Sequence, residues 1–156
     1  MLNLVYDAPD MDRDLHVLVV APTGRDATLI SALLTKEGIE CTVCSSSEEA
    51  LERVVGSGAL VVAEEVFTPS NIAAWGQKIA TQSSWSDYPL IVLTVAGAVD
   101  PNSQKKMLFR EPLGNVVLLE RPIRPETLVS TVQASLRSRR RQYQIRDYLA
   151  QRRKTE

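Results

Sequence analysis

Several short apolar segments of this chain end at residues that could do chemistry. Carboxylates can hold magnesium or act as nucleophiles, and the planar fork of an arginine suits a carboxylate. The residues in such positions are Ala21-Pro22-Thr23, Glu64-Glu65, Thr94 and Glu120-Arg121-Pro122. They can act together only if the fold brings the ends of these segments to one place.

The turn APTGRDAT at residues 21–28 follows an apolar run, where many proteins with a parallel sheet bind phosphate. A P-loop needs the pattern GxxxxGK[ST], whose glycines let backbone amides approach the phosphates and whose lysine balances their charge. This turn has one glycine and no lysine, and a dinucleotide fingerprint would need three glycines. The residues therefore exclude both kinds of nucleotide site.

The elements that must position these residues alternate along the chain. Apolar runs are typical of strands covered on both faces, and amphipathic segments with serine caps or glycine stops are typical of helices. We expect strands within residues 15–21, 39–45, 59–67, 88–97 and 115–120. We expect helices within 25–38, 46–58 and 70–83, a short one within 101–112, and a long one from Pro125. The expected inward residues are Leu29, Leu33 and Leu34 in the first helix and Ile72, Trp75 and Ile79 in the third.

Five strands that alternate with five helices predict a doubly wound α/β fold, in which a five-stranded parallel sheet lies between two layers of helices. The chain, with 156 residues, is long enough for one such domain. In these folds the functional loops lie at the carboxyl ends of the strands, along one edge of the sheet. We therefore expect the chemically capable residues to meet at that edge.

Three features together resemble the receiver domain of bacterial two-component response regulators: the strand pattern, the threonine that closes LIVLT at 90–94, and the segment ERPIRPETL at 120–128. The resemblance covers about residues 15–139 and implies a flavodoxin-like sheet of order 2-1-3-4-5. In that family an acid pair ends the first strand and holds magnesium, and an aspartate that ends the third strand takes the phosphoryl group. A threonine or serine ends the fourth strand, and a lysine before a cis proline ends the fifth.

This chain departs from the family's pattern at most of these positions. Ala21 and Pro22 stand where the acid pair should be, and they offer no side-chain oxygen to a metal ion. The other positions hold Glu64 at the phosphoacceptor, Thr94 at the hydroxyl, and Arg121-Pro122 in place of the lysine and proline. The resemblance therefore implies a degenerate receiver, or pseudo-receiver.

Phosphoryl transfer to a carboxylate depends on a metal ion that neutralises the phosphoryl oxygens and holds the donor in line. Glutamate is also one methylene longer than aspartate, and small misplacements of a reacting group cost about a hundredfold in rate. We expect no catalytic residue, no metal, no cofactor and no enzyme activity. The degenerate phosphoacceptor site would consist of Glu64, Glu65, Thr94, Arg121 and Pro122. An ion pair between Glu64 and Arg121 would replace the metal centre, and solvated glutamates at a strand end are the alternative.

The last helix is expected to continue beyond the domain, because no glycine or proline interrupts residues 126–154. Its first half carries an apolar stripe suited to packing on the sheet. Its second half, with Tyr143, Ile145, Tyr148 and Leu149, is expected to lie too far out to reach that core. The candidate interface residues are Leu136, Tyr143, Tyr148 and Leu149, and we expect a homodimer through this helix. A frayed basic tail is the alternative.

The expected organisation is a flexible lead-in at 1–14, a receiver-like domain at 15–138, and a basic helical extension at 139–156 that leads to a partner or a downstream module. From Arg137 onward the chain carries eight basic and two acidic residues, a net charge of +6, against −7 in the first 136 residues. Such a tail could touch nucleic acid or anionic lipid, but a solvated helix face is the simpler interpretation.

The end of the chain also resembles the receiver-like segment at the N-terminus of bacterial sensor histidine kinases. The resemblance implies a module that regulates an attached or partner histidine kinase or another signalling protein. No apolar run in the sequence approaches the ~20 residues that a membrane-spanning helix needs, so we expect a cytoplasmic location. The one histidine, His16, stands at the start of an expected strand, whereas a kinase carries its phosphoacceptor histidine on a helix. The alternative functions are a phosphorylatable receiver and a nucleic-acid-binding regulator that uses the basic tail.

The pair Cys41 and Cys44 in CTVC could suggest a redox or metal site. Residues three apart on a strand point to opposite faces of the sheet, and a zinc site needs more ligands than this pair supplies. We expect core or half-buried thiols.

Overall fold

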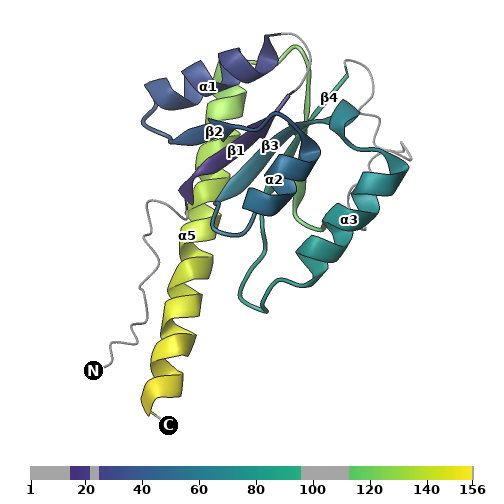
Figure 1. Ribbon diagram of the computed structural model, residues 1–156. Helices are drawn as coiled ribbons and strands as arrows, with labels where there is room; N and C mark the ends of the chain where they lie inside the picture. Colours follow the sequence, from purple (N-terminus) through teal and green to yellow (C-terminus); the bar gives the residue numbers. More distant parts are fainter. Residues whose placement is uncertain (1–14, 22–24, 96–112, 156) are drawn as a thin grey trace.

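The computed structural model describes residues 15–21, 25–95 and 113–155. The expected lead-in at 1–14, Pro22, and the expected short helix at 101–112 lie outside the described residues. Within the described part, a parallel sheet lies between two layers of helices (Figure 1). The α/β fold predicted from the alternation of apolar and amphipathic segments is confirmed.

Within the described ranges, the sheet has five parallel strands in the order β2-β1-β3-β4-β5, as predicted. They are β1 (Val17–Val20), β2 (Cys41–Val43), β3 (Ala59–Ala63), β4 (Leu90–Thr94) and β5 (Val116–Glu120). Every residue of β1, β3 and β4 is buried, because helices cover both faces of these central strands. The register pairs Thr94 with Glu120, so the carboxyl ends of β4 and β5 lie side by side.

Local sequence explains where the helices begin. The Ser46 hydroxyl accepts a hydrogen bond from the Glu49 amide at 3.1 Å and so caps the second helix. A reciprocal capping box between Thr68 and Asn71, with Pro69 at the first helical position, starts the third. The helical elements are α1 (Asp26–Lys36), α2 (Ser47–Arg53), the short 3-10 helix η2 (Glu64–Val66), α3 (Pro69–Ala80) and α5 (Pro125–Thr155).

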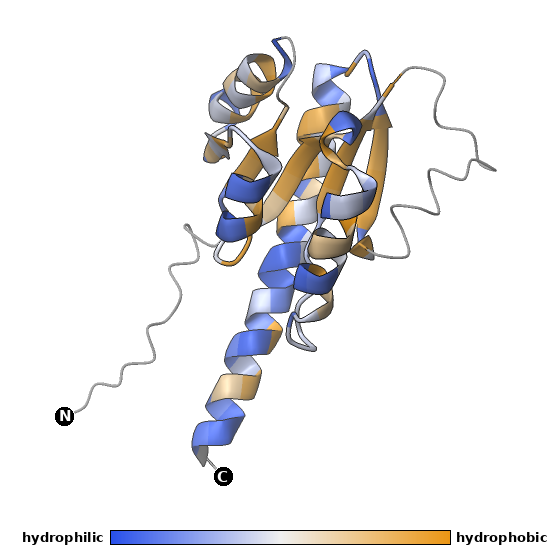
Figure 2. Cartoon of the chain, turned by 45° about the vertical axis from the view of Figure 1, so that its right-hand side comes forward, coloured by the Kyte–Doolittle hydropathy of each residue, from blue (hydrophilic) through white to orange (hydrophobic). Residues whose placement is uncertain are grey.

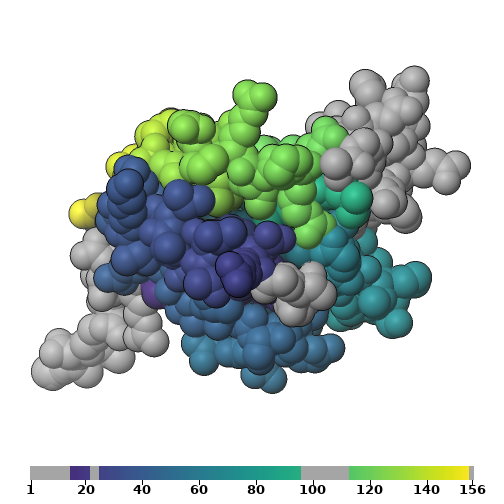
Figure 3. All heavy atoms as spheres, turned by 90° about the horizontal axis from the view of Figure 1, so that it is seen from above, coloured from purple at the N-terminus to yellow at the C-terminus, as the bar shows by residue number. Residues whose placement is uncertain are grey.

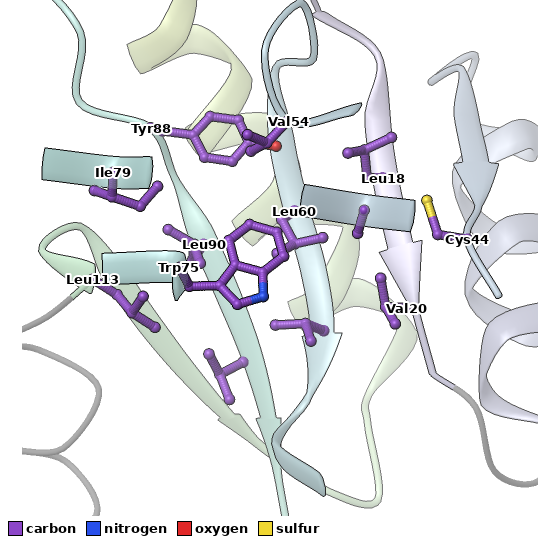
Figure 4. Packing of buried hydrophobic residues seen from close by; sticks show 13 residues of the cluster. Leu18, Val20, Cys44, Val54, Leu60, Trp75, Ile79, Tyr88, Leu90 and Leu113 are labelled. Atoms are coloured by element: carbon purple, nitrogen blue, oxygen red, sulfur yellow. The ribbon is translucent and has the colours of Figure 1, made fainter. Parts of the chain in front are cut away.

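The side chains of the strands alternate between two cores. On one face, α1 and α5 pack on strand residues such as Val19 and Val61. On the other face, α2 and α3 cover residues such as Leu60 and Leu90, with Trp75 of α3 at the centre (Figure 4). The Trp75 indole nitrogen donates a hydrogen bond to the Ser47 hydroxyl at 2.9 Å, so this buried polar group is satisfied and ties α3 to α2.

The inward face of α1 differs from the predicted one. Leu34 is buried and Leu33 is half-buried against the same core, as predicted, but 58% of Leu29 is exposed and Ile30 is buried instead. The helix starts at Asp26 and its i, i+4 stripe points Ile30 and Leu34 at the strands, which turns Leu29 outward. In α3 the prediction is confirmed, since Trp75 and Ile79 are buried.

The two cysteines lie on opposite faces of the sheet, as predicted. Cys41 packs beside the core under α1 and α5, and Cys44 is buried in the core under α2 and α3. Both are free thiols.

The last helix runs to Thr155 without interruption, as predicted, and its second half carries mostly hydrophilic residues (Figure 2). The expectation that Tyr143 lies too far out to reach the domain was wrong, because only 2% of this residue is exposed. The connection between α3 and β4 reaches α5, and its Trp85 ring meets the Tyr143 ring edge-on, with 6.0 Å between centroids. Leu136 is also buried, so neither Leu136 nor Tyr143 is available to a partner. The expected boundary after residue 138 therefore falls inside the packed part of α5.

Candidate functional site

The residues singled out in the sequence meet at the carboxyl edge of the sheet. Glu64 and Glu65 form the turn after β3, Thr94 ends β4, and Arg121 follows β5. Figure 3 looks onto this edge and shows the start of α1, in purple to blue, against the green segment that follows β5. Asp26, the first residue of α1, forms an ion pair with Arg121.

Arg121 is the centre of this edge. Its Nη1 donates to Asp26 Oδ2 at 3.3 Å, and its Nη2 donates to Glu65 Oε1. Its Nε and backbone amide both donate to the Thr94 carbonyl, at 3.3 and 2.9 Å. The guanidinium therefore joins α1, the turn after β3 and the end of β4 in one charged cluster, defined here as the Arg121 centre (Asp26, Glu65, Thr94 and Arg121).

The predicted ion pair between Glu64 and Arg121 was wrong, because the glutamate that pairs with Arg121 is Glu65. Glu65 makes that contact, while Glu64 Oε1 accepts a hydrogen bond from the Val95 amide at 3.2 Å. The cause is the 3-10 turn that follows β3. With three residues per turn, successive side chains of η2 point about 120° apart, so the two glutamates cannot both face Arg121.

The other predicted positions that the structure describes are Thr94, Pro122 and Ala21. Thr94 is 2% exposed, and its hydroxyl donates to the Leu119 carbonyl at 3.4 Å, across the β4–β5 pair. The peptide bond between Arg121 and Pro122 is cis. Ala21, directly after β1, is 7% exposed and presents only a methyl group to this edge.

Charge balance favours a permanently protonated Arg121. Partial burial lowers the pKa of its guanidinium, but the hydrogen bonds and charges of Glu65 and Asp26 outweigh burial and raise that pKa above its ordinary value. Two carboxylates face one guanidinium, so the centre carries a formal charge of about −1 and is held together by charge-assisted hydrogen bonds.

No protein-family model and no curated protein sequence matches the chain. Solved structures do match it. Full-length FixJ from B. japonicum aligns over 80% of this chain with a TM-score of 0.62 and 21% identity. Chemotaxis protein CheY4 from Vibrio cholerae aligns over 78% with a TM-score of 0.60 and 22% identity. NtrX from Brucella abortus aligns over 85% with a TM-score of 0.66 and 16% identity.

The chain has the fold of a response-regulator receiver domain. The aligned region spans 98% of CheY4, but only 58% of FixJ and 28% of NtrX. This receiver-like chain thus corresponds to all of the small neighbour and to part of the two larger ones.

The magnesium ion implied by the resemblance to receivers does not fit the residues of this edge that the structure describes. Mg²⁺ needs oxygen ligands in near-octahedral geometry, at least one or two of them carboxylates. The position after β1 is apolar, and the carboxylates of Asp26 and Glu65 already face the Arg121 guanidinium. Among the described residues, no group of three or more histidine, cysteine, aspartate or glutamate side chains could hold a metal ion.

Sequence reasoning missed Asp26 as a member of the site. The signal was present, because Asp26 follows the APTGR turn and acidic residues favour the first turn of a helix. That rule explains why an acid stands there but does not predict a partner 95 residues away.

None of the helices in the described ranges is long and apolar enough to cross a membrane.

Proposed function

We propose that this receiver-like chain is a pseudo-receiver, a signalling module of two-component type that acts through protein contacts and not through phosphoryl transfer. The observation that carries the proposal is the Arg121 centre, in which one guanidinium engages both Asp26 and Glu65. Arg121 stands where the receivers that this chain resembles have a lysine, and here its guanidinium is engaged by two carboxylates of the chain itself.

The chemistry of arginine supports this proposal. A guanidinium stays charged throughout the physiological pH range and presents its donors in a rigid fork, so it satisfies carboxylates durably. A phosphoryl group at this edge would need positive charge that Asp26 and Glu65 already neutralise. Glu64, at the position of the phosphoacceptor, holds the Val95 amide with one of its carboxylate oxygens. Among the described residues of this edge, both the acids and the guanidinium are thus engaged by groups of the chain itself.

Such a module would contact its signalling partner through α5. Beyond the packed part of this helix, Ile145, Tyr148 and Leu149 are 51%, 59% and 39% exposed. Their i, i+3, i+4 spacing places them in one stripe, on the side of α5 away from the buried Tyr143. We infer that this stripe pairs with a second copy of the chain or continues into the helices of an attached or partner histidine kinase.

A mass measurement tests whether the edge accepts a phosphoryl group. The chain is incubated with acetyl phosphate and Mg²⁺, beside a receiver domain that is known to be phosphorylated under these conditions. We expect the control to gain the mass of one phosphoryl group and this chain to gain none. A magnesium-dependent gain that disappears in Glu64→Gln, but not in Glu65→Gln, would make the chain a phosphorylatable receiver and overturn the proposal.

A further inference from the structure

A pocket lies at the opposite edge of the sheet from the Arg121 centre. It has a volume of about 480 Å³ and is bordered by the end of α2, by α3, by the connection 81–88 and by α5. Figure 4 shows Val54, Ile79 and Tyr88 together at this end of the core. A pocket of this volume is in the range that holds small-molecule ligands.

The charged side chains that line the pocket are all positive. They are Lys78 from α3 and Arg139 and Arg146 from α5, and no aspartate or glutamate is among the lining residues. Arg146 pairs with Asp147 at 3.2 Å, and Asp147 is not among the lining residues. The lining itself therefore has an excess of positive charge, which favours an anionic occupant.

Arg139 is the most unusual of these groups, because only 6% of it is exposed and no carboxylate in the described residues pairs with it. Its Nη1 donates to Ser86 Oγ at 2.8 Å and to Gln142 Oε1 at 2.6 Å, and its Nε donates to Tyr143 Oη at 3.1 Å. These neutral acceptors orient the guanidinium without neutralising its charge. A buried charge that lacks a counter-ion is costly, and an anion that enters the pocket would remove that cost.

Aromatic rings form the walls next to the two arginines. The Arg139 guanidinium carbon lies 5.6, 5.3 and 4.9 Å from the ring centroids of Trp85, Tyr88 and Tyr143. The Arg146 guanidinium carbon lies 5.4 Å from the Trp85 centroid and 4.5 Å from that of Tyr143. Flat apolar surfaces beside two planar cations suit a ligand that is itself flat.

We propose that this pocket binds a small aromatic anion, meaning a planar ring system that carries one carboxylate, sulfonate or similar group. The ring packs against Trp85 and the apolar wall formed by Val54 and Ile79. The anionic group faces Lys78, Arg139 and Arg146. Such a ligand contacts α3 and α5 at the same time, and its binding does not depend on whether the Arg121 centre accepts a phosphoryl group.

The experiment uses anilinonaphthalene sulfonate, a fluorescent aromatic anion, as the probe. We expect saturable binding with one site per chain, followed by fluorescence and by the two tryptophan indole N–H signals in a ¹H–¹⁵N spectrum. The signal assigned to Trp85 should shift, and the signal of the buried Trp75 should stay in place. A Trp85→Phe variant assigns the two signals, because it removes one of them.

Charge variants decide whether the pocket is the site. Lys78→Gln and Arg146→Gln should each weaken binding of the probe about tenfold, since each removes one charge-assisted contact. Arg140→Gln, an exposed position on α5 outside the pocket, should leave the affinity unchanged. The uncharged analogue phenylnaphthylamine should bind at least about tenfold more weakly than the sulfonate. The proposal would be overturned by absence of saturable binding, by equal affinity for the sulfonate and the neutral analogue, or by pocket variants that bind the probe as tightly as the unmodified chain does.

Discussion

Arg121 Nη1 lies 3.3 Å from Asp26 Oδ2, which joins two residues 95 positions apart in the sequence. The contact connects the first residue of α1 to the segment after β5 at the carboxyl edge of the sheet. Glu65 completes the contact from the turn after β3. The edge that serves receivers as a reaction site is here organised around an internal cation.

Removal of the Arg121 side chain should destabilise the fold moderately. Arg121→Ala leaves two carboxylates facing each other without their donor, and because all three side chains are partly exposed we expect a loss of about 1 kcal/mol in the free energy of unfolding. Urea unfolding measures it. The matched control is Arg124→Ala, an exposed arginine in the same segment, which should change stability by less than about 0.5 kcal/mol. Equal effects of the two variants would show that the Arg121 centre contributes no stability.

Tyr143 should contribute strongly to the free energy of unfolding, because it lies in the packed part of α5. Its hydroxyl donates to the Ser57 carbonyl at 3.3 Å and its ring lies under Arg139. Tyr143→Ala therefore opens a cavity and removes a partner of a buried guanidinium, and we expect a loss of about 3 kcal/mol. Tyr148→Ala, at an exposed tyrosine five residues further along the same helix, should cost less than about 0.5 kcal/mol. Thermal unfolding of both variants measures the difference. Equal stability of Tyr143→Ala and Tyr148→Ala would contradict the packing of Tyr143 against the domain.

The exposed stripe on α5 should mediate self-association. Sedimentation velocity at increasing concentration should show a dimer for the unmodified chain, because Ile145, Tyr148 and Leu149 expose apolar surface along one side of a rigid helix. Leu149→Glu should shift the equilibrium toward the monomer by at least about tenfold, since it places a charge inside the contact. Gln77→Glu adds the same charge at an exposed site on α3, on a different helix from the stripe, and should leave the dimer intact. A monomer at all concentrations would remove the homodimer from the account and leave a partner protein as the occupant of the stripe.

The two thiols should differ in reactivity. Burial, with a further contribution from the charge of Glu49 and against the opposing charge of Arg53, raises the pKa of the Cys44 thiol above its ordinary value. The folded state thus holds this proton more tightly than the unfolded state. The stability that results is complete below the ordinary thiol pKa of 9.0 and falls as the pH rises above it. A thiol-exchange reagent at about pH 8 should label the half-buried Cys41 rapidly and Cys44 only after unfolding, with Cys41→Ala and Cys44→Ala assigning the two phases. Rapid labelling of Cys44 in the folded chain would contradict its burial.

The order of the strands in the sheet followed from the resemblance to receiver domains and not from the apolar pattern. The strands themselves could be predicted because each is an apolar run, or for β2 an alternating segment, followed by a turn or helix signal. Thr94 and Arg121 could be placed for the same reason, since both end such runs. Which glutamate meets Arg121 could not be predicted. That choice depends on the 3-10 turn of η2, whose side-chain directions differ from those of a strand, and the apolar pattern carries no information about it.

The inward face of α5 beyond residue 138 could not be predicted from the sequence either. Leu136, Arg139, Tyr143 and Arg146 follow a helical i+3, i+4, i+3 stripe, but two of the four are arginines, which normally indicate a solvated face. In the structure both guanidiniums lie against aromatic rings, so they pack where an apolar residue was expected. Trp85 supplies the partner ring, and nothing in the local sequence places it beside α5.

The central claim is that the Arg121 guanidinium takes the place of a metal ion at the carboxyl edge. A Mg²⁺ titration followed in ¹H–¹⁵N spectra, with the unmodified chain and Arg121→Ala in parallel, tests it most directly. The account predicts no saturable shifts at Asp26, Glu65 or Thr94 in the unmodified chain. It predicts saturable shifts in Arg121→Ala, where the two carboxylates are released. Saturable shifts at these residues in the unmodified chain, as strong as those in the variant, would contradict it.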